Sequence, residues 1–340
     1  MKRGVIAGKF LPPHKGHSYL IESGRNQCDE LYVLICDRPE YLIPAPIRKS
    51  WLEAMHPGVN FIIITDDLDD DDSAGWAQAT IELLGFQPDL VFSSEDYGKR
   101  WAKHLGAKHI MVDQARVALP VSATMIRNDP WTNWEYLDPE VRAYFTKRIC
   151  LVGSESSGTT TLTKALAKHY KTDWVPEYGR QYSVDEKERL DREGWKSSDF
   201  VTIAQKQNEL EDTAAKTANK LLFCDTDSFA TGVWHKRYMG GRSSEVEALA
   251  AGRRYDLYIL TDTHIPFEDD GLRDGEEFRE WMQEEFIDKL RFWGKPFILV
   301  KGNPQERLEQ AVSTINMLVN DSVVQIEGLQ RNRWQHQGGF

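Results

Sequence analysis

The sequence predicts an α/β protein made of two doubly wound parallel-sheet domains, and three observations carry this prediction. Short β-rich runs alternate with helix-length amphipathic stretches along most of the chain. A loop suited to phosphate follows the first expected strand of each half. The length of 340 residues is enough for two domains that each bury a core. Strands that alternate with helices favour parallel sheets with helices on both faces.

The expected elements follow from hydrophobic periodicity and turn residues. In the first half, strands are expected at residues 3–7, 31–36, 61–65, 90–92 and 109–112, and helices at 17–27, 46–55, 75–84 and 97–105. In the second half, strands are expected at 148–153, 220–224, 257–261 and 297–300, and helices at 160–170, 200–217, 276–292 and 304–319.

The chain is expected to divide into a first domain of residues 1–128, a connector of residues 129–147, a second domain of residues 148–320 and a tail of residues 321–340. The connector holds two prolines and several aromatic residues, which favours a packed helical segment over a free linker. The polar tail is expected to fray.

Composition limits the partners. The net charge of -11 and the pI of about 5.4 disfavour nucleic acid and acidic membrane surfaces. No apolar run approaches the roughly 20 residues of a membrane span, and the chain enters its first strand without a signal-like segment. We expect a cytoplasmic protein that acts on small molecules, with neither nucleic acid nor membrane as a partner. The oligomeric state is undecided, and a homo-oligomer stays open.

Two minor features have plain interpretations. The four cysteines show no paired or metal-type spacing and are expected to be reduced core residues. The acidic run at residues 66–72 is expected to be a solvated loop with helix-capping carboxylates, and a metal site is the alternative.

The first phosphate loop is GKFLPPHKGH at residues 8–17. A strand ends at a glycine, and two histidines bracket Gly16 where a helix should begin. A helix N-terminus offers unpaired N–H groups and partial positive charge, and two imidazoles add donors. Histidines that only cap and pack the helix would explain one of the pair and not the whole set. The residues expected to bind the triphosphate of ATP here are Gly8, Lys9, Phe10, His14, Gly16 and His17.

A second segment, VSATMIR at residues 121–127, complements the first. Ser122 and Thr124 can cap a helix and donate hydroxyls to phosphate, and Arg127 supplies a guanidinium for the β- or γ-phosphate. The two segments resemble the G-x-F-x-P-x-H-x-G-H and I-S-S-T-x-I-R signatures of the nucleotidyltransferase superfamily, with Ala123 as a small departure. His14, His17 and Arg127 are the expected catalytic residues. Mg²⁺ is expected to bridge the triphosphate oxygens, without a dedicated protein ligand in this half.

The second phosphate loop is GSESSGTT at residues 153–160, between a strand and a helix as a P-loop requires. Thr159 stands where a P-loop has its lysine, and Thr160 supplies the Mg²⁺-binding hydroxyl. The missing charge must come from another residue, and Lys164 is a turn further along. The loop residues expected to bind ATP are Gly153, Ser156, Ser157, Gly158, Thr159, Thr160 and Thr161.

Accessory segments favour phosphoryl transfer in this half. Asp225 and Asp227 follow a strand, where a metal-binding acid and a substrate-hydroxyl acid would lie. Thr160 and Asp225 are the expected Mg²⁺ ligands. A glycine-flanked Arg273 is typical of a phosphate-closing lid, and Arg273 or Arg180 could replace the missing lysine. The alternatives are a glycine turn without catalysis and aspartates that only cap strand ends.

The order of these motifs, joined through D-P-W-x-N-W-E-Y-L, resembles the bifunctional NadR-type family over about residues 1–319. The matching segments of the second half are E-S-S-G, P-E-Y-x-R, D-T-D and D-D-G-L-R. The resemblance implies that the second domain phosphorylates nicotinamide riboside to nicotinamide mononucleotide with ATP and Mg²⁺. It implies that the first domain transfers AMP from ATP to that mononucleotide and releases NAD and pyrophosphate.

The resemblance also assigns substrate contacts. Arg48 and Trp51 would bind the mononucleotide, the alternative being a core tryptophan and a solvated arginine. Glu177 and Arg180 would bind the riboside, either Asp225 or Asp227 would receive the 5′-hydroxyl proton, and Arg307 would lie in an adenine-side loop. No helix-turn-helix precedes the first strand, so the sequence offers no basis for DNA binding.

Two competing hypotheses stay open. The kinase half could bind nucleotide without catalysis and regulate an active adenylyltransferase, because Thr159 replaces the lysine. The first domain could transfer a nucleotide to another acceptor, such as a pantetheine or flavin phosphate, because related enzymes share this machinery.

Overall fold

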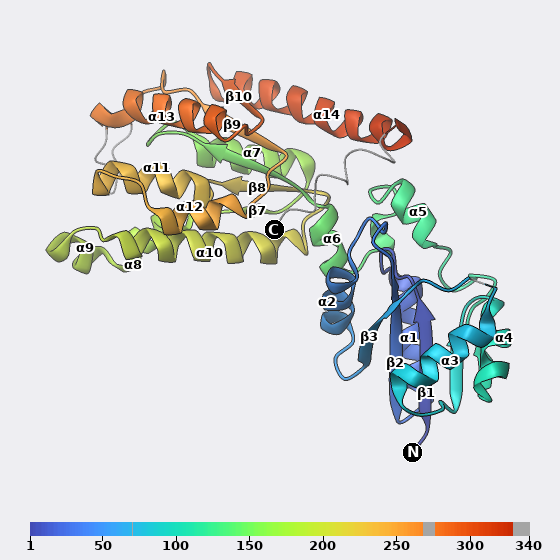
Figure 1. Cartoon of the computed structure of the whole chain (residues 1–340). Coiled ribbons are helices and arrows are strands. Elements are labelled where there is room, and N and C mark those ends of the chain that lie inside the picture. The colour runs from blue at the N-terminus through green and yellow to red at the C-terminus, as the bar shows by residue number, and fades with distance from the viewer. Residues whose placement is uncertain (70, 268–275, 329–340) are drawn as a thin grey trace. The chain divides into compact units, whose positions relative to one another are not determined.

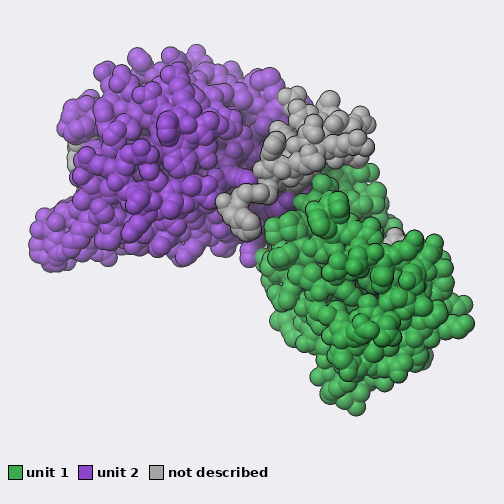
Figure 2. Space-filling view, viewed as in Figure 1, with its two compact units in different colours: residues 1–142 green, residues 143–340 purple. Residues whose placement is uncertain are grey.

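The computed structural model describes residues 1–69, 71–267 and 276–328, with side chains up to residue 320. The chain forms two compact units, Met1–Arg142 and Ala143–Phe340 (Figure 2). Within the described part of the chain, no helix is both long enough and apolar enough to cross a membrane. The two parallel sheets expected from the sequence are confirmed.

Unit 1 holds a five-stranded sheet in the order β3-β2-β1-β4-β5, with all pairs parallel. The strands are β1 (Arg3–Gly8), β2 (Glu30–Asp37), β3 (Asn60–Thr65), β4 (Leu90–Ser93) and β5 (Lys108–Met111). The helices are α1 (Lys15–Arg25), α2 (Ala45–Met55), α3 (Ser73–Leu84), α4 (Tyr97–Leu105) and α5 (Ala123–Asn128). The strand order reverses between β1 and β4, and ligands bind at such switch points in open parallel sheets.

The two faces of this sheet bury alternate side chains of the same strands. Ile6 of β1 packs with residues of α1 and α2 on one face. Val5 of β1 packs with residues of α3 and α4 on the other. The expected elements of this half therefore match the observed ones closely, because alternating burial on two faces leaves a readable apolar pattern in each strand.

The connector is divided between the units. Its first part forms η1 (Trp134–Tyr136) and the start of α6 (Pro139–Phe145), with Trp134, Leu137 and Val141 buried. It is helical and packed, as expected, but residues 129–142 belong to unit 1.

Unit 2 holds the sheet β10-β9-β6-β8-β7, again all parallel (Figure 1). Its strands are β6 (Lys147–Val152), β7 (Trp174–Val175), β8 (Leu221–Asp225), β9 (Leu257–Thr261) and β10 (Phe297–Val300). Its helices are α7 (Thr159–Tyr170), α8 (Tyr178–Asp185), α9 (Lys187–Glu193), α10 (Ser197–Ala215), α11 (Ser228–Met239), α12 (Ser244–Ala251), α13 (Arg279–Phe292) and α14 (Pro304–Gly328), with the short η2 (Glu276–Phe278) before α13.

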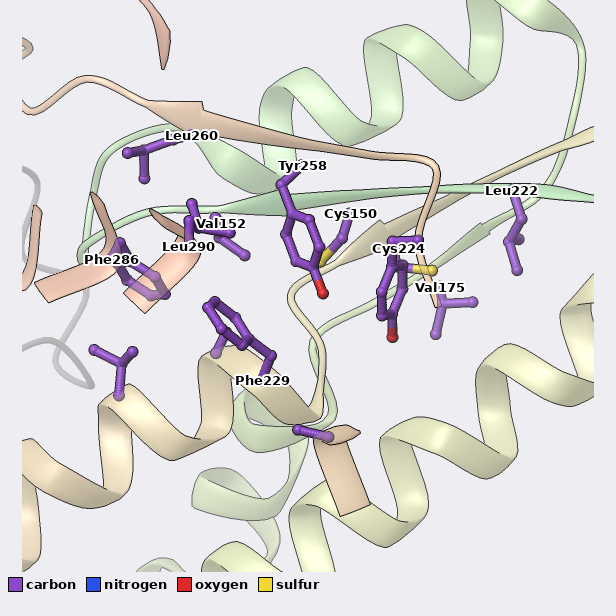
Figure 3. Close-up of a cluster of buried hydrophobic side chains, with 14 of the residues drawn as sticks. Cys150, Val152, Val175, Leu222, Cys224, Phe229, Tyr258, Leu260, Phe286 and Leu290 are labelled. Carbon is purple, nitrogen blue, oxygen red and sulfur yellow. The ribbon is translucent and has the colours of Figure 1, made fainter. Parts of the chain in front are cut away.

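One core cluster lies between this sheet and helices α10 to α13. Figure 3 shows Cys150, Cys224 and Tyr258 of the strands beside Phe229 of α11, with Phe286 and Leu290 of α13 nearby. All four cysteines are free thiols, and all but the half-buried Cys28 are buried, so the expectation of reduced core residues holds for three of them.

Some elements differ from the expectations. Helix α11 is buried nearly all round, and it therefore lacks the amphipathic period that marks a surface helix. Helix α14 continues to Gly328, past the expected start of the frayed tail at residue 321. Residues 329–340 lie outside the described part.

Candidate active sites

A cavity of about 550 Å³ lies at the carboxyl ends of β1 and β4 in unit 1. It gathers every residue that the sequence assigned to ATP and catalysis in this half, although they come from segments more than a hundred positions apart. These lining residues are Gly8, Lys9, Phe10, His14, Gly16, His17, Ser122, Thr124 and Arg127. The two motifs therefore form one site.

His14 and His17 stack at the N-terminus of α1, with ring centroids 3.8 Å apart. Nδ1 of His14 accepts a hydrogen bond from the Gly16 N–H at 3.1 Å, so Nε2 carries the proton of the neutral ring. Burial, assisted by the charge of Arg116, lowers the pKa of His14 to about 4. Burial also places the pKa of His17 well below its ordinary value. Burial therefore favours the neutral form of both rings, in which each imidazole can donate and accept hydrogen bonds.

His17 has capacity for a ligand. Its Nδ1 is buried and has no hydrogen-bond partner among the described residues. A buried polar nitrogen without a partner is costly unless a ligand or water satisfies it. The nitrogen belongs to a residue that lines the cavity beside a helix N-terminus, where phosphate oxygens are favoured acceptors.

Helix α5 is tied to the loop after β1 by Arg127. Its guanidinium donates to the Leu11 carbonyl at 2.6 Å and to Thr124 Oγ1 at 2.9 Å. Ser122 caps the helix by accepting from the Met125 N–H at 3.2 Å. The cap confirms the expected start of the helix, and the arginine links α5 to the loop that leads to the histidines.

The cavity also contains residues that sequence reasoning missed. Arg100, Arg116 and Trp76 line it. The indole N–H of Trp76 donates to the Asp69 carbonyl at 3.1 Å, which holds the ring in the cavity wall. A usable signal existed for Arg116, because it follows β5 at the carboxyl edge of the sheet and precedes the VSATMIR segment.

The acidic run contributes to this wall in two ways. Asp72 caps α3 by accepting from the Gly75 N–H at 2.9 Å, as expected. Asp66 is instead buried, with Arg38 at 3.1 Å and Lys9 at 3.9 Å, so the expectation of a solvated loop is wrong for this residue. The described residues contain no cluster of three His, Cys, Asp or Glu side chains that could hold a metal.

Arg48 and Trp51 are absent from the residues lining the cavity. Arg48 is fully buried and donates to the carbonyls of Ile43 at 2.8 Å and Cys36 at 3.0 Å. It also bonds the Lys9 carbonyl and the Asp37 carboxylate. The expected substrate contact and the alternative of a solvated arginine are both corrected: the guanidinium ties together the ends of β1 and β2. Trp51 is half-buried on the same helix.

A second cleft, of about 170 Å³, surrounds the P-loop of unit 2. Predicted residues that line it are Gly153, Ser156, Gly158, Thr159, Thr160, Thr161, Glu177, Arg180 and Asp225. The loop turns through left-handed backbone at Ser156 (φ 56°) and Gly158 (φ 85°). A Cβ at Gly153 would collide with the hydroxyls of Ser157 and Thr261, so this close approach requires glycine.

The buried Ser157 side chain forms hydrogen bonds within the P-loop and to β9. It is buried, its hydroxyl donates to the Ser154 carbonyl at 2.6 Å, and it lies 2.7 Å from Thr261 Oγ1. Its side chain therefore does not line the cleft, so any contact of Ser157 with ATP would be made by its backbone.

The two aspartates after β8 have separate environments, which the sequence could not distinguish. Thr160 Oγ1 donates to Asp225 Oδ2 at 2.5 Å, within the cleft. Burial raises the pKa of Asp225, and the hydroxyls of Thr160 and Thr159 oppose that rise. Asp227 lies outside the cleft lining and is fully buried. It accepts from the Ala230 N–H at 2.8 Å and from the Tyr258 hydroxyl at 2.7 Å.

The predicted catalytic role of Asp227 is thus corrected in favour of the capping alternative. Its carboxylate begins α11 and pairs with a buried tyrosine, so both oxygens already have partners inside the protein. Asp225 is the acid that faces the P-loop.

The guanidinium of Arg307 is engaged by the protein backbone. Its guanidinium donates to the carbonyls of Gly302 at 2.8 Å, Ser157 at 2.6 Å and Asp262 at 3.1 Å. These bonds join the P-loop to the ends of β9 and β10, and Arg307 is not among the residues that line the cleft. Arg273, the expected lid arginine, lies outside the described residues.

Aromatic side chains complete the cleft and were missed at the sequence level. They are Trp195 just before α10, Phe200 in α10, and Trp234 and Tyr238 in α11. Trp195 and Tyr238 lie with ring centroids 5.2 Å apart. Predicting helix α11, which begins directly after Asp227, would have placed Trp234 and Tyr238 near the cleft.

Known proteins share both halves of this arrangement. A family model described as an AAA domain matches residues 148–307. The trifunctional NAD biosynthesis/regulator protein NadR of Escherichia coli (strain K12) is 32% identical over 320 residues, covering 85% of this chain and 78% of that protein. The same-named protein of Salmonella typhimurium (strain LT2) is 31% identical over 322 residues, covering 88% and 78%.

Solved structures agree on the fold. A NadR protein in complex with NR has a TM-score of 0.75 at 22% identity, covering 93% of this chain and 96% of that one. A NadR protein in complex with NAD and AMP-PNP has a TM-score of 0.73 at 22% identity, covering 94% and 96%. Because the sequence match extends over most of both proteins, and both phosphate sites are assembled here, the chain belongs to the NadR family.

Proposed function

We propose that this protein makes NAD in two steps, one in each unit. Unit 2 phosphorylates nicotinamide riboside to nicotinamide mononucleotide with ATP. Unit 1 transfers AMP from a second ATP to that mononucleotide and releases pyrophosphate. The observation that carries the proposal is the assembly of the histidine and VSATMIR segments into one cavity, in a chain that belongs to the NadR family. The cytoplasm, where ATP is supplied, is its proposed location.

The adenylyl step requires alignment and charge stabilisation, without a covalent intermediate. A phosphate oxygen of the mononucleotide attacks the α-phosphorus of ATP, and the bond to the pyrophosphate leaving group breaks. The triphosphate would lie at the N-terminus of α1, where Nε2–H of His14 and the buried His17 ring face the cavity. Neutral rings suit this role, because they donate hydrogen bonds without needing to hold a proton that the cavity disfavours.

Positive charge for the phosphates comes from arginines on the cavity wall. Arg127 is held by the Leu11 carbonyl and Thr124, and Arg116 and Arg100 lie on the same cavity. Trp76, held through its indole N–H, is an aromatic residue of the cavity lining that could stack on the nicotinamide ring. This proposal replaces Trp51 in that role.

The kinase step uses Asp225 in the second cleft. Phosphoryl transfer depends mainly on positioning and charge stabilisation, with little covalent work for the protein. Asp225 is the acid available to accept the proton of the riboside 5′-hydroxyl, because Asp227 is occupied by Ala230 and Tyr258. Glu177 lines the same cleft and is proposed to bind ribose hydroxyls. The aromatic rings of α10 and α11 would enclose the pyridinium.

The donor set suits Mg²⁺. Mg²⁺ commonly takes one or two protein oxygens and fills its remaining positions with water and phosphate. The Thr160 hydroxyl and Oδ2 of Asp225, 2.5 Å apart, are such a pair and would hold the ion, which leaves Oδ1 of Asp225 to accept the proton of the 5′-hydroxyl. When bound, the ion would neutralise charge on the β- and γ-phosphates.

A second candidate function is a nucleotide-binding kinase half that regulates an active adenylyltransferase. The observation in its favour is Thr159 at the lysine position of the P-loop. Two incubations with ATP and Mg²⁺ distinguish the candidates, one with nicotinamide riboside and one with nicotinamide mononucleotide, with products followed by chromatography. The proposal predicts NAD from both. NAD from the mononucleotide alone would leave only the adenylyl step, and no NAD from either would leave another acceptor as the hypothesis for unit 1.

A further inference from the structure

We propose that Arg180 supplies the cation that the P-loop lacks, and that it reaches the β- and γ-phosphates of ATP from α8 across the cleft. The inference rests on the proposed kinase function and concerns the departure that separates this chain from an ordinary P-loop. Arg180 is the one lysine or arginine among the described residues that lines this cleft.

Three neighbouring cations are absent from the residues that line the cleft. Arg307 lies behind the loop and donates to three backbone carbonyls. Arg237 pairs with Glu155 at 2.6 Å and lies over the rings of Trp234 and Tyr238, with only 4% of its side chain exposed. Lys164 lies over the Trp174 ring, 5.2 Å from its centroid, and is not part of the cleft lining.

The first turn of α8, which carries Arg180, is linked by hydrogen bonds to the end of β8, where Asp225 lies. It lies in the first turn of α8, directly after Glu177. The buried Gln207 of α10 accepts from the Tyr178 N–H at 2.9 Å and donates to the Thr226 carbonyl at 3.4 Å. One side chain therefore links the first turn of α8 to the residue that follows Asp225. Arg180 and Asp225 thus lie in one cleft on linked segments.

A guanidinium can do from this side what a lysine does from within the loop. Its planar fork binds phosphate oxygens in a bidentate manner, and it stays charged in proteins. Thr159 is short, and its hydroxyl bonds the Asp225 carboxylate. A threonine fills less of the cleft than a lysine would, and Arg180 is a second residue of the same lining that can carry the charge.

The test is a rescue experiment with four variants of the full chain: Arg180→Ala, Thr159→Lys, and the double variants Arg180→Ala with Thr159→Lys or Thr159→Met. Riboside phosphorylation is measured with KM determined separately for ATP and riboside, and AMP-PNP and AMP affinities are measured by calorimetry. Arg192→Ala is the matched control, because Arg192 is an exposed arginine on α9 that pairs with Glu193.

We expect Arg180→Ala to lower kcat on the order of 10²–10³-fold, as for loss of one preorganised charge-stabilising group, and to weaken AMP-PNP more than AMP. In the Arg180→Ala background, adding Thr159→Lys should recover at least about tenfold of the lost kcat. Adding Thr159→Met should recover none of it, since a P-loop lysine acts through its charge. Arg192→Ala should match the wild type. Wild-type kcat in Arg180→Ala, a change confined to the riboside KM, or no recovery by Thr159→Lys would each overturn the inference.

Failure of the proposed function has a different signature. If the wild type phosphorylates no riboside, the kinase function fails, and the binding measurements decide the inference alone. Selective loss of AMP-PNP affinity in Arg180→Ala, restored by Thr159→Lys, would then support Arg180 as the phosphate cation. Unchanged AMP-PNP affinity would reject it.

Discussion

Asp227→Ala and Asp227→Asn test whether this carboxylate is a structural group, as its two buried hydrogen bonds indicate. Alanine removes the N-cap of α11, which costs about 1 kcal/mol. It also leaves the buried Tyr258 hydroxyl without its acceptor, which costs about 1–3 kcal/mol. Unit 2 should therefore lose about 2–4 kcal/mol of unfolding free energy in the alanine variant.

Asparagine keeps an oxygen for the Ala230 N–H and offers an amide that can donate to the Tyr258 oxygen. It also removes a buried charge, whose cost shows in the raised pKa of Asp227. The asparagine variant should stay within about 1 kcal/mol of the wild type, because both hydrogen bonds are kept. Riboside phosphorylation should persist in both variants below their unfolding transitions.

The assay pairs urea unfolding, followed by tryptophan fluorescence, with chromatography of the phosphorylated product. Asp225→Asn is the matched control and should show the reverse: a nearly unchanged unfolding midpoint and a loss of kcat on the order of 10²-fold or more, as expected when a positioned proton acceptor is removed. The reasoning is refuted if Asp227→Asn abolishes phosphorylation as fully as Asp225→Asn while its unfolding midpoint stays at the wild-type value.

Three further predictions concern unit 1. His17→Ala should lower NAD formation from the mononucleotide on the order of 10²–10³-fold while riboside phosphorylation stays intact; loss of both activities in a folded variant would contradict separate sites. Because burial depresses the pKa of His14 from 6.5 to about 4, its neutral form should stabilise unit 1 fully above pH 6.5, and up to about 3 kcal/mol should be lost as the pH falls from 6.5 toward 4. Urea midpoints measured across that range should show this slope, and His14→Asn should reduce it; equal slopes would refute the assignment. Arg48→Met should leave the carbonyls of Ile43 and Cys36 unpaired. It should destabilise unit 1 by about 3–5 kcal/mol, as for a broken buried ion pair, while phosphorylation in unit 2 is preserved. A stable variant with a raised KM for the mononucleotide would instead restore Arg48 as a substrate contact.

Apolar patterns in the sequence were sufficient to predict most strands and helices of the fold. The strands of unit 1 bury alternate residues on two helix-covered faces, so each leaves an apolar run that reads as a strand. Helix α11 was missed because its local cue is weak: it lacks a polar face. Its absence from the expectations also hid the rings of Trp234 and Tyr238.

The predicted positions of site residues were more accurate where the surrounding motif specifies its own local geometry. The Gly8–His17 segment encodes a strand end, a turn and a helix start, and the six residues expected to bind ATP all line one cavity. Single polar residues chosen by spacing, such as Arg48 and Arg307, turned out to bond backbone carbonyls inside the protein. Spacing along a helix identifies a face, and it does not say whether that face meets solvent, a ligand or the ends of neighbouring strands.

The sequence by itself determined the two parallel sheets, the two phosphate loops and their order along the chain, because periodicity, glycine turns and helix caps are local properties. Only the tertiary structure decided which charged groups face a ligand. Asp225 and Asp227 are two residues apart at the end of one strand, yet one faces the P-loop and the other is buried against Tyr258. The environment of a carboxylate or a guanidinium is set by residues distant in sequence, and packing alone brings those residues together.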